Sequence, residues 1–276
     1  MKLQVRGAET FATTGGRPFV PEQPTIVFVH GAGMNRIVWY LQTRYFAHHG
    51  YTVLAVDLPG HGRSQGTVLG SVQELADWIP DLLDSAGVAK ATLVGHSMGS
   101  LIALESAARH PDRVSKLALL GVAPKMPVHP DLLNAAKADD PLAYELMMDW
   151  GTGQVGHFGR HPVPGFSLIP GGQKLLGMEN SGVLGIDLGL CNDYQSGMES
   201  ATKVSCPTLI VMASEDKMTP PKQGEKLAAA IPNVKKTAHS ELWTHDDDRK
   251  IRSNYAGTES TFKQHLESQI NSGIVE

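Results

Sequence analysis

Continuous runs of apolar, mostly β-branched residues recur through the first half of the chain and once more beyond residue 200. These runs lie at Thr25–Val29, Thr52–Val56, Ala91–Val94, Lys116–Leu120 and Thr208–Met212. Runs that are apolar on both faces are typical of parallel strands buried between two layers of helices. We therefore predict that these five segments are strands of one central sheet.

Segments of helical length and period separate the first four runs, most clearly Ser71–Ala86 and Met98–His110. Strand alternating with helix predicts an α/β fold with a doubly wound, mostly parallel sheet and right-handed crossovers. At the start of the chain, Lys2–Val5 and Thr10–Thr13 lie on either side of Gly7. We expect them to add an antiparallel hairpin at the edge of the sheet.

The alternation stops after the fourth run, and no further β-like run occurs before Thr208. Early in this stretch, Pro130–Ala138 and Pro141–Trp150 have helical patterns. An unstructured loop of this length is uncommon inside a compact domain. We therefore predict a partly helical cap at residues 122–201, inserted into a core domain made of residues 1–121 and 202–276.

Composition narrows the range of partners. The chain has 276 residues, of which 41% are hydrophobic and 19% charged, as in ordinary globular proteins. Its formal net charge of −4 leaves no basic footprint for nucleic acid. No stretch approaches the ~20 apolar residues of a membrane span, and Met1–Gly16 lacks the apolar core of a signal peptide. We expect a cytoplasmic protein with no nucleic-acid partner and no membrane span.

The sequence gives no sign of a metal or cofactor site. Two cysteines, Cys191 and Cys206, rule out a disulfide scaffold and a cysteine-rich zinc module. His157 and His161, with His129 upstream, do not have the spacing of metal ligands. There is also no G-x-x-x-x-G-K-[ST] phosphate loop. We predict neither a metal nor a cofactor.

The strongest chemical motif is G-H-S-M-G at residues 95–99, between a predicted strand and a predicted helix. In this context G-x-S-x-G forms a sharp turn that lifts the serine hydroxyl out of the sheet. The first amides of the following helix then face an oxygen bound beside the serine. We predict Ser97 as a nucleophile and the Met98 amide as an oxyanion donor. A serine N-cap with helix-packing glycines is the alternative.

A second motif, H-G-A-G at residues 30–33, also follows a predicted strand. Small residues at such a turn let the backbone approach a substrate closely and direct its amides inward. Paired with the serine motif, it would complete an oxyanion hole, with the Ala32 amide opposite that of Met98. We interpret His30 as a structural hydrogen-bonding residue and not as the catalytic base.

A third motif, D-L-P-G-H-G-R-S at residues 57–64, follows the strand predicted at Thr52–Val56. With the two motifs above, in this order and spacing, the chain resembles the α/β-hydrolase family over Pro24–Val122. The resemblance implies an eight-stranded, mostly parallel sheet, a cap after the sixth strand, and a nucleophile–acid–histidine triad in that chain order. Asp57 and His61 match family positions that usually shape this loop, so neither is expected to be catalytic.

The acid is implied by the same resemblance. Pro207–Ala213 resembles the family's seventh strand, and Ser214–Pro220 resembles the loop that follows it. Asp216 occupies the position of the family's acid, with Glu215 as the alternative. A carboxylate at this position would fix the tautomer of the catalytic imidazole and stabilise the imidazolium that forms when Ser97 loses its proton.

The catalytic base is the point at which this chain departs from the family. The family has an eighth strand, then Gly-His, then a glutamate five residues beyond the histidine. Residues 235–248 instead read K-K-T-A-H-S-E-L-W-T-H-D-D-D, with no glycine before either histidine and no apolar run for a strand. We favour His245 as the base and keep His239 as the alternative. A chain without a working base, serving as a non-catalytic ligand-binding protein, is the third possibility.

A slipped reading frame would explain this departure. Trp is encoded by TGG and Thr by ACN, so reading Trp243–Thr244 one base later gives GGA, a glycine codon. Thr244–His245 can then give a histidine codon, and the following codons permit the missing Gly-His-x-x-x-x-Glu. We infer that the coding sequence slipped near Lys236. A gene sequence without GGA across Trp243–Thr244 would exclude this hypothesis.

Together these features predict a hydrolase of small-molecule carboxylic esters that forms an acyl-enzyme on Ser97 with a Ser97–Asp216–His245 triad. In the family the same triad also serves C–C bond, thioester and amide hydrolysis and cofactor-free perhydrolysis, and these remain alternatives. Haloalkane and epoxide opening in this fold require a carboxylate nucleophile, so a serine counts against both. The cap and the sheet edge could each mediate a homodimer.

Overall fold

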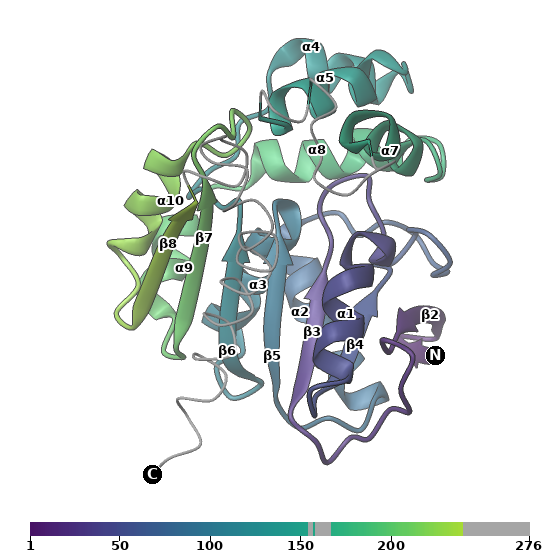
Figure 1. The fold of residues 1–276 in the computed structure, drawn as a ribbon, viewed down its shortest axis with the longest axis vertical. Helices are drawn as coiled ribbons and strands as arrows, with labels where there is room; N and C mark the ends of the chain where they lie inside the picture. The colour runs from purple at the N-terminus through teal and green to yellow at the C-terminus, as the bar shows by residue number, and fades with distance from the viewer. Residues whose placement is uncertain (154–156, 158–166, 240–276) are drawn as a thin grey trace, which may run out of the picture.

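A twisted, eight-stranded sheet forms the centre of the molecule in the computed structural model, which describes residues 1–153, 157 and 167–239 (Figure 1). The strand order is β1-β2-β4-β3-β5-β6-β7-β8. From β4 to β8 all neighbours pair in parallel, whereas β2 pairs antiparallel with both β1 and β4. The strands are β1 (Lys2–Val5), β2 (Ala8–Thr13), β3 (Thr25–Val29), β4 (Thr52–Val56), β5 (Ala91–His96), β6 (Val114–Leu120), β7 (Thr208–Ala213) and β8 (Val234–His239). The prediction of a doubly wound, mostly parallel α/β sheet is confirmed.

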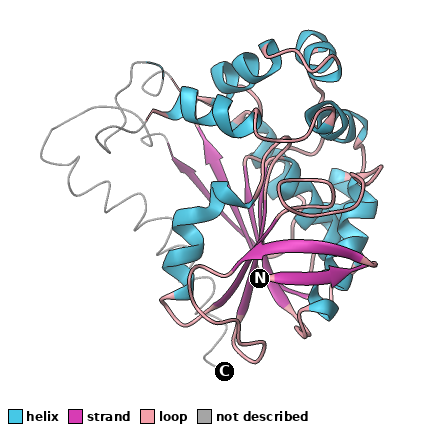
Figure 2. Ribbon diagram, turned by 90° about the vertical axis from the view of Figure 1, so that its right-hand side faces the viewer, coloured by secondary structure: helices cyan, strands magenta, loops and turns pink. Residues whose placement is uncertain are grey.

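The strands follow the hydrophobic runs closely. β3 and β4 begin and end at the predicted residues, and every residue in both is buried. β1 and β2 form the predicted hairpin, which lies at the near edge of the sheet in Figure 2. Its turn places Arg6 and Gly7 at φ angles of 50° and 79°. Two successive positive φ angles are typical of the tight turns that suit strand twist.

An eighth strand is present even though its sequence contains no apolar run. β8 pairs in parallel with β7, from Val234 opposite Thr208 to His239 opposite Ala213. Backbone hydrogen bonds can hold such an edge strand without two apolar faces. Lysines on an exposed edge also discourage pairing with other chains, and Lys235 and Lys236 are both exposed.

Two hydrophobic clusters cover opposite faces of the sheet. Alternate residues of β3 supply both, because successive side chains of a strand point to opposite faces. Val27 and Val29 belong to the cluster that packs against α2 (Val72–Ser85) and α3 (Met98–Arg109). Ile26 and Phe28 belong to the other cluster, which packs against η1 (Arg36–Trp39) and α1 (Tyr40–Ala47). The sheet is therefore a buried layer, as its apolar runs predicted.

Four helices gather above the carboxyl ends of the strands (Figure 1). They are α4 (Pro130–Lys137), α5 (Leu142–Gly151), α7 (Leu168–Leu176) and α8 (Val183–Asp193). The sequence predicted α4 and α5 but not α8, which contains Gly185 and Gly189. A Cβ built on Gly185 would lie 2.9 Å from the carbonyl oxygen of Ala136. The glycine therefore allows α8 to pack closely against α4.

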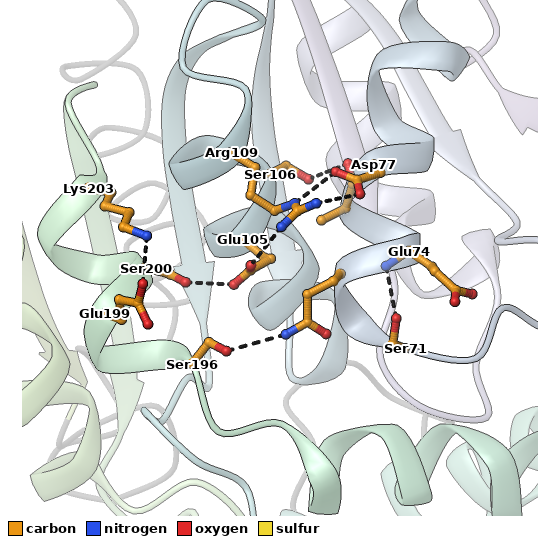
Figure 3. A network of polar contacts seen from close by, with 12 residues as sticks. Ser71, Glu74, Asp77, Glu105, Ser106, Arg109, Ser196, Glu199, Ser200 and Lys203 are labelled. Atoms are coloured by element: carbon orange, nitrogen blue, oxygen red, sulfur yellow. Dashed lines mark hydrogen bonds and ion pairs between the residues drawn. The ribbon is translucent and has the colours of Figure 1, made fainter.

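A polar network joins residues 194–200, which follow these four helices in the chain, to α3 and α2 (Figure 3). The buried Glu105 on α3 accepts hydrogen bonds from the hydroxyls of Ser200, at 2.6 Å, and Tyr194, at 2.8 Å. Ser200 lies on α9 (Gly197–Lys203), and α10 (Pro221–Ala228) follows β7. Gln73 of α2 donates to Ser196 at 3.4 Å. These contacts hold α9 and the residues before it against α3 and α2.

Candidate active site

Ser97 lies at a strained turn between β5 and α3. Its φ and ψ angles are 53° and −119°, a region that non-glycine residues seldom occupy. A Cβ built on Gly95 would lie 2.1 Å from the carbonyl oxygen of Gly99, and one built on Gly99 would lie 2.3 Å from that of Val29. The glycines of the motif are therefore required by close backbone packing.

The N-cap alternative for Ser97 does not fit this geometry. The Ser97 side chain makes no capping hydrogen bond to α3. In contrast, Ser71 caps α2 by accepting from the Glu74 amide at 3.1 Å. The turn is held by the Ser97 backbone, whose amide donates to the carbonyl oxygen of Leu120 at 2.9 Å. The hydroxyl is thereby left without a capping role at the start of a helix.

The H-G-A-G loop at residues 30–33 packs directly beside Ser97. A Cβ built on Gly31 would lie 3.3 Å from the Cβ of Ser97. The carbonyl oxygen of Gly31 accepts from Nδ1 of His30 at 2.9 Å and from the Met34 amide at 3.2 Å. In a planar trans peptide, the amide of Ala32 points opposite to the carbonyl of Gly31. These two hydrogen bonds therefore fix the direction of the Ala32 amide.

His30 is a structural hydrogen-bonding residue, as its place before the H-G-A-G turn predicted. Its Nε2 accepts from the Leu58 amide at 3.1 Å, so the proton resides on Nδ1, which donates to Gly31. Burial, and after it the nearby charge of His61, hold the pKa of His30 well below its usual range. The ring is thus neutral near pH 7, and both of its nitrogens are occupied.

Asp57 shapes the 57–64 loop, as the resemblance implied. It is buried and accepts from the Arg36 amide at 2.9 Å, the Arg36 Nη1 at 2.5 Å and the Arg63 amide at 2.9 Å. Gly62 has a φ of 51°, and a Cβ there would lie 2.6 Å from the Asp57 carboxyl group. Asp57 therefore organises backbone in this loop and does not line the cavities around Ser97 that are described below.

The carboxylate of Asp216 is held firmly in the loop after β7. Oδ1 accepts from the amides of Met218, at 2.8 Å, and Thr219, at 2.9 Å, and Oδ2 accepts from the Thr219 hydroxyl at 2.6 Å. Asp216 lines a cavity that Ser97 also lines. Glu215, the alternative acid, lines neither of the two cavities that reach Ser97. The fold therefore brings Asp216, Ala32 and Ser97 to one place.

Two cavities meet at Ser97 and share Ala32, Met147, Met218 and Thr219. The first, of about 140 Å³, is further lined by Gly31, Met34, His96, Met148, Gly151, Thr152 and Asp216. The second, of about 120 Å³, is further lined by Met126, Pro127, Val128, His129, Leu132, Trp150, Leu188, Cys191 and Lys217. Methionine fills and adapts to irregular apolar space. The site is therefore a small apolar space with a hydroxyl between its two halves.

The two candidate bases are placed differently. His239 is the last residue of β8, and its backbone lies opposite Ala213, three residues before Asp216. His239 is therefore at the same edge of the sheet as the Asp216 loop. His245 lies outside the described residues, as does the segment of the proposed frame slip near Lys236 from residue 240 onward. Both bases stay predictions.

Two side chains that were not predicted from the sequence lie at or next to the site. His96, inside the serine motif, lines the first cavity with Ser97 and Asp216. Burial lowers its pKa against the opposing effect of the Asp216 charge, so its ring is neutral near pH 7. Asp187 of α8 accepts from the Gly33 amide, next to Ala32. No local pattern could indicate Asp187, because the contact joins segments far apart in the chain.

Three other expectations concern metals, cysteines and membrane spans. In the described part of the chain, no group of three or more His, Cys, Asp or Glu side chains is arranged to hold a metal ion. Cys191 and Cys206 are free and buried, as small apolar residues would be. Within the same residues, none of the helices has both the length and the apolar character needed to cross a membrane.

Comparison with known proteins agrees with this fold. Residues 24–163, about half of the chain, match the family model described as alpha/beta hydrolase fold. Among solved structures, the enol-lactonase from Burkholderia xenovorans LB400 superposes with a TM-score of 0.80 at 21% identity, over 97% of this chain and 98% of that one.

Two sequence relatives match this chain over part of its length or at low identity. A pimeloyl-[acyl-carrier protein] methyl ester esterase of Neisseria meningitidis is 28% identical over 241 residues, which cover 80% of this chain and 72% of that protein. An (E)-2-((N-methylformamido)methylene)succinate hydrolase of Acinetobacter baylyi is 37% identical over 100 residues, 36% of this chain and 38% of that protein. The match to this hydrolase thus spans little more than a third of its length.

Proposed function

Because this chain belongs to the α/β-hydrolase fold family, we propose that it is a serine hydrolase that cleaves carboxylic esters through an acyl-enzyme on Ser97. The observation that carries the proposal is the strained backbone of Ser97. Strain of this kind persists only where the surrounding structure enforces it, and it concentrates at functional sites. Here it turns a hydroxyl toward two small apolar cavities.

In this proposal the hydroxyl of Ser97 attacks the ester carbonyl carbon, and its proton passes to a histidine. The negative charge that develops on the carbonyl oxygen is stabilised by the amides of Met98 and Ala32. The histidine then protonates the leaving alkoxide, which departs as the alcohol. Water, activated by the same histidine, cleaves the acyl-enzyme and restores Ser97.

Asp216 is the acid of the proposed triad. Its three hydrogen bonds from Met218 and Thr219 support this role, because they hold the carboxylate in a fixed position. A fixed carboxylate orients the imidazole and stabilises the imidazolium as it forms. His245 is the proposed base and His239 the alternative.

The two cavities favour small, largely apolar substituents on the ester. Their volumes, about 140 Å³ and about 120 Å³, are close to that of an apolar cavity of about 150 Å³ that holds one benzene molecule. One would receive the acyl group and the other the alcohol. Lys217 is the single lysine or arginine among their described lining residues. Dicarboxylate substrates, which call for several cationic partners, fit this lining less well than neutral esters do.

Turnover of p-nitrophenyl acetate and p-nitrophenyl butyrate by the full chain tests the proposal. Removing one member of such a triad lowers kcat by about 10⁴- to 10⁶-fold. Ser97→Ala should therefore abolish measurable turnover. Ser100→Ala is the matched control, because Ser100 donates to the Ser97 carbonyl oxygen at 2.6 Å from inside α3 and does not line either cavity. Equal turnover by the wild type and Ser97→Ala would refute the proposal.

The same assay assigns the base. His245→Gln should lose turnover as completely as Ser97→Ala, whereas His239→Gln should retain it. The reverse pattern would transfer the role to His239. Labelling of Ser97 by a fluorophosphonate without ester turnover would indicate a site that lacks a working base.

A further inference from the structure

A buried ion pair joins the cap helix α8 to the 57–64 loop. Oδ2 of Asp187 lies 2.8 Å from Nε2 of His61, and both side chains have no exposed surface. Nδ1 of His61 lies 3.0 Å from the carbonyl oxygen of Pro59. Both ring nitrogens thus face acceptors, so the arrangement suits the doubly protonated imidazolium.

The pKa of His61 agrees with this geometry. Burial by itself would lower it, but the Asp187 charge and the hydrogen bonds to Asp187 and Pro59 together raise it above its usual value. A buried pair of this kind is costly to desolvate and does not by itself indicate high stability. Its contacts with the neighbouring backbone are therefore the more informative feature.

Asp187 also holds the backbone next to the proposed oxyanion donor. The same Oδ2 accepts from the Gly33 amide at 2.8 Å, which fixes the Ala32–Gly33 peptide. On the other side of Ala32, the Gly31–Ala32 peptide is fixed by the hydrogen bonds that the Gly31 carbonyl oxygen accepts. Ala32 is thus clamped by hydrogen bonds on both flanking peptides, and α8 supplies one of the two clamps.

The close packing of α8 on Gly33 makes the hydrogen bond between the Gly33 amide and Asp187 possible. Gly33 has a φ of 62°, and a Cβ there would lie 2.7 Å from Cδ1 of Leu184, one turn before Asp187 on α8. The glycine therefore lets the helix approach closely enough for Asp187 to reach the amide. Glu179, just before α8, adds a second link by accepting from the Gly62 amide at 2.8 Å and from Asn35 Nδ2 at 2.7 Å.

We propose that Asp187 is a positioning residue of the oxyanion hole, and that its pairing with His61 locks the cap helix α8 onto the loop that carries the Ala32 amide. The inference rests on the proposed function, because it concerns the transition state of reaction at Ser97. Asp187 touches neither substrate nor Ser97. It acts through the Gly33 backbone.

Two variants separate positioning from general stability. Asp187→Asn removes the charge that pairs with His61. Glu105→Gln is the matched control, because Glu105 is also a buried carboxylate that ties the last residues of the predicted cap, Tyr194 and Ser200, to α3, without a hydrogen bond to the 30–33 loop. A positioning role predicts a kcat lower by about 10- to 100-fold in Asp187→Asn, since misplaced groups cost about this much. KM should change little, and Glu105→Gln should keep its kcat.

A transition-state analogue gives a second readout. Binding of a trifluoromethyl ketone, which forms an oxyanion on Ser97, should weaken in Asp187→Asn by the same factor as kcat. A loss shared equally by Asp187→Asn and Glu105→Gln, or a change in KM alone, would overturn the proposal. If Asp187→Asn fails to fold, Asp187→Ser makes the same test, because the shorter, neutral side chain cannot hold both His61 and the Gly33 amide as the carboxylate does.

Amide hydrogen exchange tests the clamp without any turnover. The Gly33 amide should exchange at least about tenfold faster in Asp187→Asn than in the wild type, and at the wild-type rate in Glu105→Gln. Unchanged exchange in Asp187→Asn would overturn the proposed clamp. If exchange at Gly33 is faster in Asp187→Asn but ester turnover does not depend on Ser97, the clamp is supported and the proposed function is refuted.

Discussion

The Cα of Gly99 packs against the carbonyl oxygen of Val29, so closely that an added Cβ would lie 2.3 Å from that oxygen. This contact joins the first turn of α3 to the carboxyl end of β3. The serine turn and the H-G-A-G loop are therefore brought together by backbone packing, before any side chain contributes.

Substitution of Gly99 should damage both fold and activity. Gly99→Ala forces the first turn of α3 away from Val29, and overpacking of this kind costs about 1–3 kcal/mol. Turnover should fall with it, because the Met98 amide moves. Gly189→Ala is the control, since Gly189 lies in α8, where an added Cβ would have no atom within 4 Å beyond its chain neighbours and the nearby backbone of its own helix. Urea unfolding of both variants checks this, and equal stabilities would contradict the packing argument.

Replacing Ser97 with glycine should relieve the backbone strain at this position and stabilise the fold. Ser97→Gly and Ser97→Ala both remove the hydroxyl, but only glycine adopts a φ of 53° and a ψ of −119° without cost. We expect Ser97→Gly to be more stable than Ser97→Ala by about 1 kcal/mol. In a helix interior the order is the reverse. A thermal melt that ranks alanine above glycine would argue against a strained turn.

Substitution of the neighbouring carboxylates Asp216 and Glu215 should identify the acid of the triad. Asp216→Asn keeps the shape of the side chain but removes the charge that stabilises an imidazolium, so kcat should fall by about 10⁴-fold. Glu215→Gln should stay within a few fold of the wild type, since Glu215 does not line the cavities at Ser97. Steady-state kinetics on p-nitrophenyl acetate make the comparison. A larger loss in Glu215→Gln would exchange the two roles.

The His61–Asp187 pair should make stability depend on pH. The pKa of His61 is raised in the folded chain, where it faces Asp187, Glu179 and the ring of His30. From about pH 6.5, the usual value for histidine, the folded state holds a proton that the unfolded state releases. The free energy of unfolding contributed by this pair therefore falls as pH rises through the raised pKa. The pKa of His30 is lowered in the folded chain, so the effect is opposite: the free energy of unfolding falls as pH drops below the usual histidine pKa, because the unfolded state binds the proton first.

Urea unfolding from about pH 5 to about pH 9 measures both effects. In His61→Gln the alkaline loss should disappear while the acid loss remains. Parallel curves for the wild type and this variant would contradict the assignment of the alkaline loss to His61.

Much of the fold could be predicted from local patterns. Thr25–Val29 and Thr52–Val56 are apolar on both faces because they lie in the middle of the sheet, so their bounds follow from composition alone. The serine turn at residues 95–99 was also predictable, because its glycines are required by close contacts within the turn and with one neighbouring strand.

The remaining features depend on contacts that a local pattern does not contain. β8 reads as polar because an edge strand relies on backbone pairing with β7. α8 carries glycines that would weaken an isolated helix, and Gly185 is there for its contact with α4. Asp187 meets His61 across 126 residues of sequence, so only the folded chain brings the two together. The base stays a prediction from the sequence, with His245 outside the described residues.

The most direct test of a reacting Ser97 is to trap the acyl-enzyme. The full chain would be mixed with p-nitrophenyl butyrate, quenched in acid within the first turnovers, and digested for mass spectrometry. We expect one butyryl group, on the peptide that contains Ser97, and none in Ser97→Ala. Rapid ester turnover with no acyl group on that peptide, or with the group on another residue, would contradict this expectation.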